Sequence, residues 1–183
     1  AIPLIELLDL AHGSLRTVLA PSGNTGYIPR AWPTADYVYM QGYALDASDN
    51  VPPHDVYVLN VSKKDVRRVA SITGYDWDLS LTTDGKHLLL GQGAALPPQG
   101  LPQPPSLISE QAASGGNLQV IYASHVYAVT QIRVISAKTL LFVLGGRFAS
   151  GARDGLWKIN MDGSGLTQLT RDGKLLSDQH TPW

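Results

Sequence analysis

Residues 154–173 read DGLWKINMDGSGLTQLTRDG, which is the pattern of a β-hairpin. An apolar-rich run at 156–160 is followed by the turn residues Asp162-Gly163-Ser164-Gly165 and then by a second run at 166–169. Short runs of this kind, bounded by Gly, Asp and Asn, predict strands. A lone hairpin is marginally stable at best in water. The rest of the chain must therefore supply what this hairpin packs against.

The same hairpin pattern occurs three more times along the chain. Its turns lie near residues 13, 64, 115 and 163, so the steps are 51, 51 and 48 residues. A further pair of short apolar runs lies between successive hairpins, at 27–32 with 37–43, at 76–82 with 86–91, and at 128–134 with 139–145. Four strands on a period near 50 residues predict the blades of a β-propeller.

The expected fold is therefore all-β, a β-propeller segment of about three to three and a half four-stranded antiparallel blades. Residues 1–183 are expected to form one partial propeller, and its parts are listed here in chain order: an outer hairpin at 4–19, blades at 27–70, 76–122 and 128–170, and the start of a next blade at 177–183. The second blade carries a Pro-rich insertion at 93–105, which cannot join a strand ladder.

Composition excludes several classes of function. The chain has 183 residues, 44% of them hydrophobic and 16% charged, which is typical of a globular protein. A net charge of −1 argues against a nucleic-acid partner. No apolar run approaches the roughly 18 to 20 residues of a membrane span. There is no cysteine, no P-loop, no Gly-x-Ser-x-Gly and no His-Glu-x-x-His, so no cofactor and no catalytic motif is expected.

One segment points to a family. Leu81-Thr82-Thr83-Asp84-Gly85-Lys86 resembles the W-S-P-D-G-K signature of TolB-like (WD40-like) propeller repeats. Asp84, Gly85 and Lys86 match that signature, whereas Leu81 and Thr83 replace its Trp and Pro. The last hairpin, which closes in Leu169-Thr170, resembles the strand-turn-strand of the same repeats. The resemblance implies a TolB-like propeller and favours a bacterial extracytoplasmic location.

Five polar residues are candidates for a ligand site on the axial face of such a propeller. They lie on the expected innermost strands or in the loops that lead into them, and they are Arg30, Asp76, Asp78, Arg133 and His180. Clustered charged groups of this kind form either a binding pocket or structural ion pairs between neighbouring blades. The other four histidines, and the basic hairpin that contains Lys63, Lys64, Arg67 and Arg68, are expected to be solvated surface.

Three functions remain open. The first is a non-enzymatic TolB-like scaffold or interaction module that binds a protein partner or the remaining blades of a larger propeller. The second is the gating propeller of a prolyl-oligopeptidase-like serine hydrolase, for which a Gly-x-Ser-x-Gly segment on the parent polypeptide would decide. The third is a catalytic propeller of the oligogalacturonate-lyase type, in which histidines bind a divalent metal; here only His180 supports it.

The sequence also predicts how the fragment behaves. Open blade faces at its two ends are expected to drive self-association or partner binding, because exposed apolar strands are unfavourable in water. Replacing Trp157 by Ala is expected to cost about 3 to 5 kcal/mol if that side chain is buried between blades.

Overall fold

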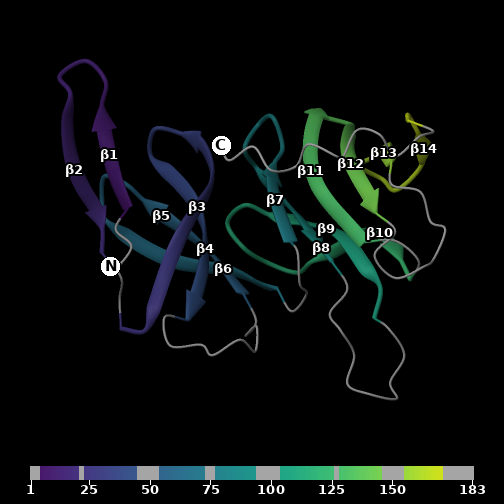
Figure 1. Ribbon diagram of the computed structural model, residues 1–183, viewed down its shortest axis with the longest axis horizontal. Helices are drawn as coiled ribbons and strands as arrows, with labels where there is room; N and C mark the ends of the chain where they lie inside the picture. The colour runs from purple at the N-terminus through teal and green to yellow at the C-terminus, as the bar shows by residue number, and fades with distance from the viewer. Residues whose placement is uncertain are drawn as a thin grey trace. The chain divides into compact units, whose positions relative to one another are not determined.

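All regular elements of the described chain are β-strands. The computed structural model describes residues 5–20, 23–44, 54–72, 77–93, 104–125, 128–145 and 155–170. Within these ranges the strands form one two-stranded and three four-stranded antiparallel sheets (Figure 1). The chain divides into two compact units, residues 1–73 with 114–116 and residues 74–113 with 117–183. The all-β propeller-segment fold predicted from the repeat is confirmed.

The first unit contains a hairpin and one complete sheet. The hairpin consists of β1 (Ile5–Asp9) and β2 (Ser14–Leu19). The sheet contains four strands in chain order, and they are β3 (Thr25–Thr34), β4 (Tyr37–Ala44), β5 (His54–Asn60) and β6 (Asp65–Ile72). Residues 38–42 of β4 are all buried, as expected of a strand covered on both faces.

An apolar core joins the hairpin to this sheet. Ile5 and Val18 of the hairpin lie in one cluster with Met40 and Leu59 of the sheet, and the latter two have no exposed surface. The rings of Tyr27 and Tyr57 meet edge to face, with centroids 5.3 Å apart. Such aromatic pairs add roughly 0.5 to 1.5 kcal/mol beyond their buried area.

The second unit contains two complete sheets. One is formed by β7 (Trp77–Leu81), β8 (His87–Gln92), β9 (Ser106–Ala112) and β10 (Gln119–Ser124). The other is formed by β11 (Ala128–Ser136), β12 (Thr139–Gly145), β13 (Gly155–Asn160) and β14 (Thr167–Gln168). Both follow chain order from the first strand to the last.

The two sheets of the second unit share a core. Leu89 and Ile108 of one sheet pack with Ile132, Phe142 and Ile159 of the other, all of them at most 1% exposed. The face-to-face packing of neighbouring blades expected from the repeat is therefore present within this unit.

The repeat is also visible in individual residues of the first unit. In the β1–β2 hairpin Asp9 pairs with Ser14, and in the β5–β6 hairpin Asn60 pairs with Asp65, exactly one repeat of 51 residues later. Both hairpins carry a register shift at the same place, between Ile5 and Glu6 and between Val56 and Tyr57. The two hairpins are thus the same structural element, formed twice.

Both turns are shaped by an oxygen acceptor and a left-handed residue. The side-chain oxygen of Asp9 accepts hydrogen bonds from the backbone N–H groups of Ala11 and His12, and Asn60 accepts one from Lys63. Gly13 has φ +63° and its counterpart Lys64 has φ +54°. Asn and Asp favour such turns because their side chains bond to the backbone two or three residues later.

Two predicted segments fall outside the described residues. These are most of the Pro-rich insertion at 93–105 and the start of a next blade at 177–183. The division of residues 1–183 into blades of one propeller stays a prediction. Trp157 is half-buried against the core of the second unit, and its buried indole Nε1 has no hydrogen-bond partner among the described residues.

Candidate functional site

Two of the five candidate residues meet in the second unit. Asp78 lies on β7 and Arg133 on β11, which are the first strands of two neighbouring sheets. Arg133 Nη1 lies 2.7 Å from Asp78 Oδ2, and the two side chains are 65% and 24% exposed. Asp78 and Arg133 therefore form an ion pair between two sheets, and their assignment to a ligand pocket stays a prediction.

An irregularity in β11 places the arginine. Thr130 pairs with Val143 and Arg133 with Leu141, so two residues of β11 face only Phe142 on the partner strand. One of the extra residues, Gln131, has φ +52°, which is uncommon for a residue with a Cβ. Bulges of this kind bend a strand and redirect its side chains. The bulge directly precedes Arg133.

The hydrogen bonds around the pair hold both partners. Arg133 Nη1 also donates to Ile132 O at 2.7 Å, and Asp78 Oδ1 accepts from the N–H of Leu79 at 2.8 Å. The N–H of Val134 donates to Ser80 Oγ at 3.4 Å, a second polar link between β11 and β7. Neither the bulge nor Ser80 could be recognised from the sequence, because strand register depends on partners far away in the chain.

The other three candidates are placed differently. Arg30 lies on β3 of the first unit, where its Nε and Nη2 donate to Oε1 of Gln41 at 3.1 and 2.5 Å. Gln41 is 7% exposed and was not singled out from the sequence. Asp76 and His180 lie outside the described residues.

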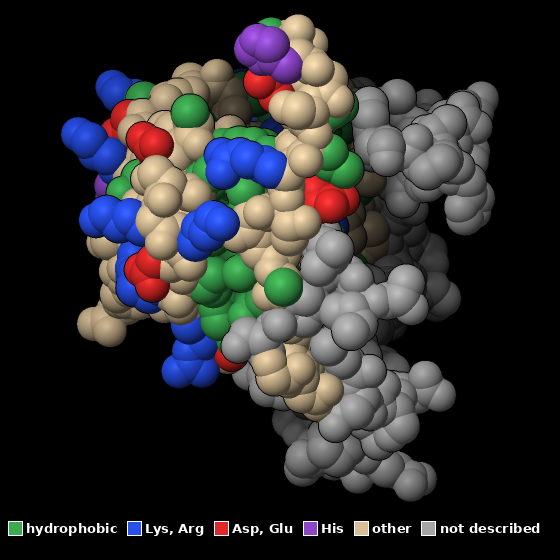
Figure 2. Space-filling view, turned by 90° about the vertical axis from the view of Figure 1, so that its left-hand side faces the viewer, with side chains coloured by type: hydrophobic (Ala, Val, Ile, Leu, Met, Phe, Trp, Pro, Cys, Tyr) green, Lys and Arg blue, Asp and Glu red, His purple; other side chains and the backbone are tan. Residues whose placement is uncertain are grey.

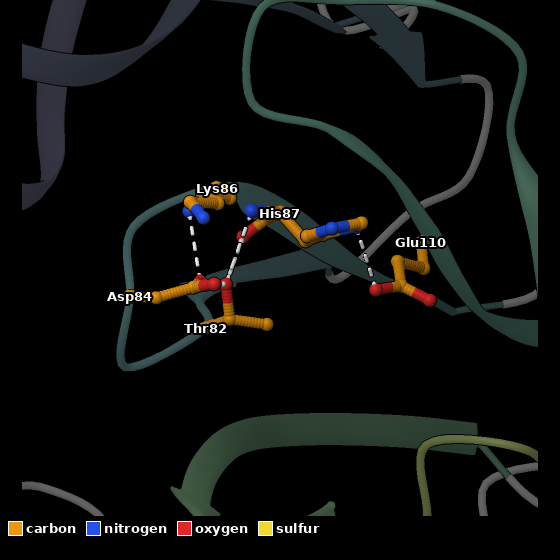
Figure 3. Close-up of polar contacts among 5 residues, drawn as sticks. All are labelled: Thr82, Asp84, Lys86, His87 and Glu110. Carbon is orange, nitrogen blue, oxygen red and sulfur yellow. Dashed lines mark hydrogen bonds and ion pairs between the residues drawn. The ribbon is translucent and has the colours of Figure 1, made fainter. Parts of the chain in front are cut away.

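The segment that resembles the TolB signature forms a tight turn between β7 and β8 (Figure 3). Asp84 Oδ1 accepts from Thr82 Oγ1 at 2.6 Å and from the N–H of Lys86 at 3.0 Å. Gly85 has φ +68°, so a residue without a Cβ suits this position. The matching residues Asp84, Gly85 and Lys86 therefore shape the turn.

These bonds affect the ionisation of the aspartate. The hydroxyl of Thr82 and then the N–H of Lys86 lower the pKa of Asp84 below its ordinary value, because both stabilise the carboxylate. Next to the turn, His87 Nδ1 lies 2.9 Å from Glu110 Oε1 across β8 and β9 (Figure 3). This contact is partly exposed, so its contribution to stability is small.

The remaining histidines and basic side chains that the structure describes lie at its surface. Among the described residues, no group of three or more His, Asp or Glu side chains could hold a metal ion. His12, His87 and His125 are exposed, as are Lys63, Lys64, Arg67 and Arg68, whereas the side chain of His54 lies outside the described residues. No helix in the described ranges is long and apolar enough to cross a membrane.

Comparison with known proteins identifies the fold. No family model and no curated protein matches the sequence. TolB from Acinetobacter baumannii superimposes with a TM-score of 0.62 at 19% identity, over 92% of this chain and 38% of that one. A putative TolB from Agrobacterium tumefaciens superimposes with a TM-score of 0.64 at 16% identity, over 91% of this chain and 56% of that one. The β-propeller domain of the Trilobed protease from Pyrococcus furiosus superimposes with a TM-score of 0.54 at 12% identity, over 80% of this chain and 44% of that one.

These similarities show a TolB-like β-propeller fold, as the turn signature and the repeat predicted. The chain spans about two fifths and just over half of the two TolB chains it resembles. At this level of identity the likeness concerns the fold alone, and the activity must be argued from the residues of this chain.

Proposed function

We propose that this TolB-like propeller segment is a non-enzymatic interaction module, and that its partner is a protein that presents a carboxylate to Arg133. What supports the proposal is the fixed, exposed guanidinium at the first strands of two neighbouring sheets. Propellers commonly bind ligands where such strands and their loops converge. Arginine is also enriched among the residues that contribute most of the binding energy at protein interfaces.

The hydrogen-bond pattern of Arg133 identifies the chemistry of the partner. Nη1 is occupied by Asp78 and by Ile132 O, and no described residue accepts from Nε or Nη2. A planar guanidinium binds a carboxylate best through two parallel N–H donors. Because Asp78 already orients the group, a partner carboxylate meets a guanidinium that has lost part of its side-chain freedom.

The test measures binding of a fluorescent peptide rich in Asp and Glu, with a neutral peptide carrying Asn and Gln at the same positions as reference. The wild-type chain is expected to bind the acidic peptide more tightly than the neutral one. Arg133→Gln is expected to weaken binding of the acidic peptide about fivefold, which is the change in affinity that loss of one exposed charge pair produces. Arg16→Gln is the matched control, because Arg16 is an exposed arginine on β2. Equal losses in the two variants would refute the proposed site.

A second candidate function is the propeller of a peptidase. The observation that favours it is the similarity to the propeller domain of the Trilobed protease. A Gly-x-Ser-x-Gly segment on the same parent polypeptide would decide for it. The lyase alternative depends on His180, which lies outside the described residues.

A further inference from the structure

Strand β10 forms the outer edge of a sheet in the second unit. The strands of this sheet lie in the order β10-β9-β8-β7, so β9 is the one described strand that bonds to β10. Val120 on β10 is 53% exposed, and Leu118, just before the strand, is 40% exposed. An edge strand presents main-chain N–H and C=O groups that can pair with another strand.

The side chains of β10 do not protect this edge. Edge strands are commonly kept from pairing with other chains by charged residues, above all lysine, or by proline. The six residues of β10 read QVIYAS, and no Asp, Glu, Lys, Arg or Pro occurs from residue 111 to residue 132. A second chain that approaches β10 therefore meets no charged group on the strand itself.

The irregularity of β10 belongs to its contact with the neighbouring sheet. The register shifts between Val120 and Tyr122. The carbonyl of Ile121, which lies between them, is next to the turn that joins β13 and β14, where a Cβ on Gly163 would come within 2.9 Å of it. Bulges can protect an edge by twisting it away. The residues on both sides of this bulge nevertheless pair with β9, so the strand continues through it.

The other outer strands of the described chain differ from β10. The outer strand of the first unit's sheet, β6, contains Asp65, Arg67 and Arg68, and β2 contains Arg16. Lys and Arg side chains project at several places from the side of the first unit that Figure 2 shows. Strand β14 has only two residues. Among the described outer strands, β10 alone is both uncharged and of ordinary length.

The sequence of β10 is complementary to itself when it is reversed. A strand that pairs with its own copy across a two-fold axis must satisfy this condition, because the same surface serves both partners. With the axis at the middle of β10, Val120 faces Ala123 of the second copy, and Gln119 faces Ser124. The same operation at the middle of β6 places its two adjacent arginines opposite each other, and directly opposed like charges are destabilising.

We propose that the edge of β10 is a self-association site, at which a second copy of this chain pairs its own β10 antiparallel across a two-fold axis. The two four-stranded sheets then continue as one sheet. Main-chain hydrogen bonds on both sides of the bulge provide the affinity, and the matched side chains fix the register. The contact uses a sheet edge and not an open blade face, and it does not involve Arg133.

Sedimentation velocity of the full chain at concentrations from about 1 to 200 µM measures this association. The expected result is a monomer–dimer equilibrium. Amide hydrogen exchange in β10 is expected to be roughly tenfold slower at the highest concentration than at the lowest, and exchange in β6 is expected to stay the same. Val120→Lys is expected to weaken dimerisation about tenfold, because the two-fold axis places the new charge at the interface twice.

Two further variants serve as controls. Ile135→Lys is matched to Val120→Lys, because Ile135 is also 53% exposed but lies on β11 of the other sheet, and it is expected to leave the dimer unchanged. Val120→Thr keeps a β-branched side chain without charge and is expected to retain the dimer. Circular dichroism identifies a variant that has lost its fold, and the concentration dependence of exchange in the wild-type chain then still decides.

Three results would overturn the inference. The first is a chain that stays monomeric over the whole concentration range. The second is a dimer in which β10 exchanges as fast as in the monomer, or which Val120→Lys weakens no more than Ile135→Lys does, because the contact then lies on another surface. The third is slow exchange of β10 amides at every concentration, which means that the edge is already covered within a single chain.

Discussion

Leu8 and Leu59 occupy the same position in two equivalent hairpins, so truncating each to alanine measures the effect of covering that position. Leu59 has no exposed surface, and Leu8 is 56% exposed. Leu→Ala deletes three carbon atoms, which is worth roughly 2.4 kcal/mol of transfer free energy when the side chain is fully buried. For Leu8, little more than two fifths of this applies, or about 1 kcal/mol, and a surface site leaves no cavity.

Leu59 has a larger expected cost. Its removal from the core of the first unit adds a cavity term, so Leu59→Ala is expected to lower the free energy of unfolding by about 3 to 4 kcal/mol. The difference between the two variants is thus about 2 to 3 kcal/mol, although the substitution and its place in the hairpin are the same.

Urea unfolding followed by far-UV circular dichroism is the appropriate assay, with the slope compared between variants to check that the same transition is measured. Equal costs for Leu8→Ala and Leu59→Ala would refute the reasoning, because β1 would then be covered as fully as β5.

Three further predictions follow from single residues. Because the pKa of Asp84 is lowered in the folded state, this carboxylate stabilises the fold above the unfolded pKa near 3.8, and that contribution is lost as the pH falls through the folded pKa. NMR titration should give a midpoint for Asp84 below 3.8, and Thr82→Val should raise that midpoint. Trp157→Phe should cost less than about 1 kcal/mol, because it removes a buried N–H that has no partner among the described residues, whereas Trp157→Ala should cost about 3 kcal/mol by urea unfolding. Gly13→Ala should cost about 1 kcal/mol, because φ is +63° and no atom lies within 4 Å of the added Cβ.

Each of these has a clear contrary result. A titration midpoint of Asp84 at or above 3.8 would mean that the Thr82 hydroxyl does not bond to it in solution. Equal costs for Trp157→Phe and Trp157→Ala would mean that the indole N–H has a partner. A neutral Gly13→Ala would mean that the turn adopts another conformation.

The sequence determined the strands, the turns and the repeat, because these depend on neighbouring residues. Alternating apolar runs, Asp-Gly turns and a step of 51 residues are local or periodic properties, and they were sufficient to predict an all-β propeller segment. The residues of the Thr82–Lys86 turn bond mainly to one another, so a resemblance in sequence was enough to predict their structure.

Only the tertiary structure decided which residues meet and which are covered. Asp78 and Arg133 are 55 residues apart, and their contact depends on the packing of two sheets and on a bulge at Gln131. Leu8 and Leu59 carry the same side chain at the same point of the repeat, yet one is exposed and the other buried. The physical reason is that burial is a property of the surface opposite a residue, and in a sheet that surface belongs to distant parts of the polypeptide.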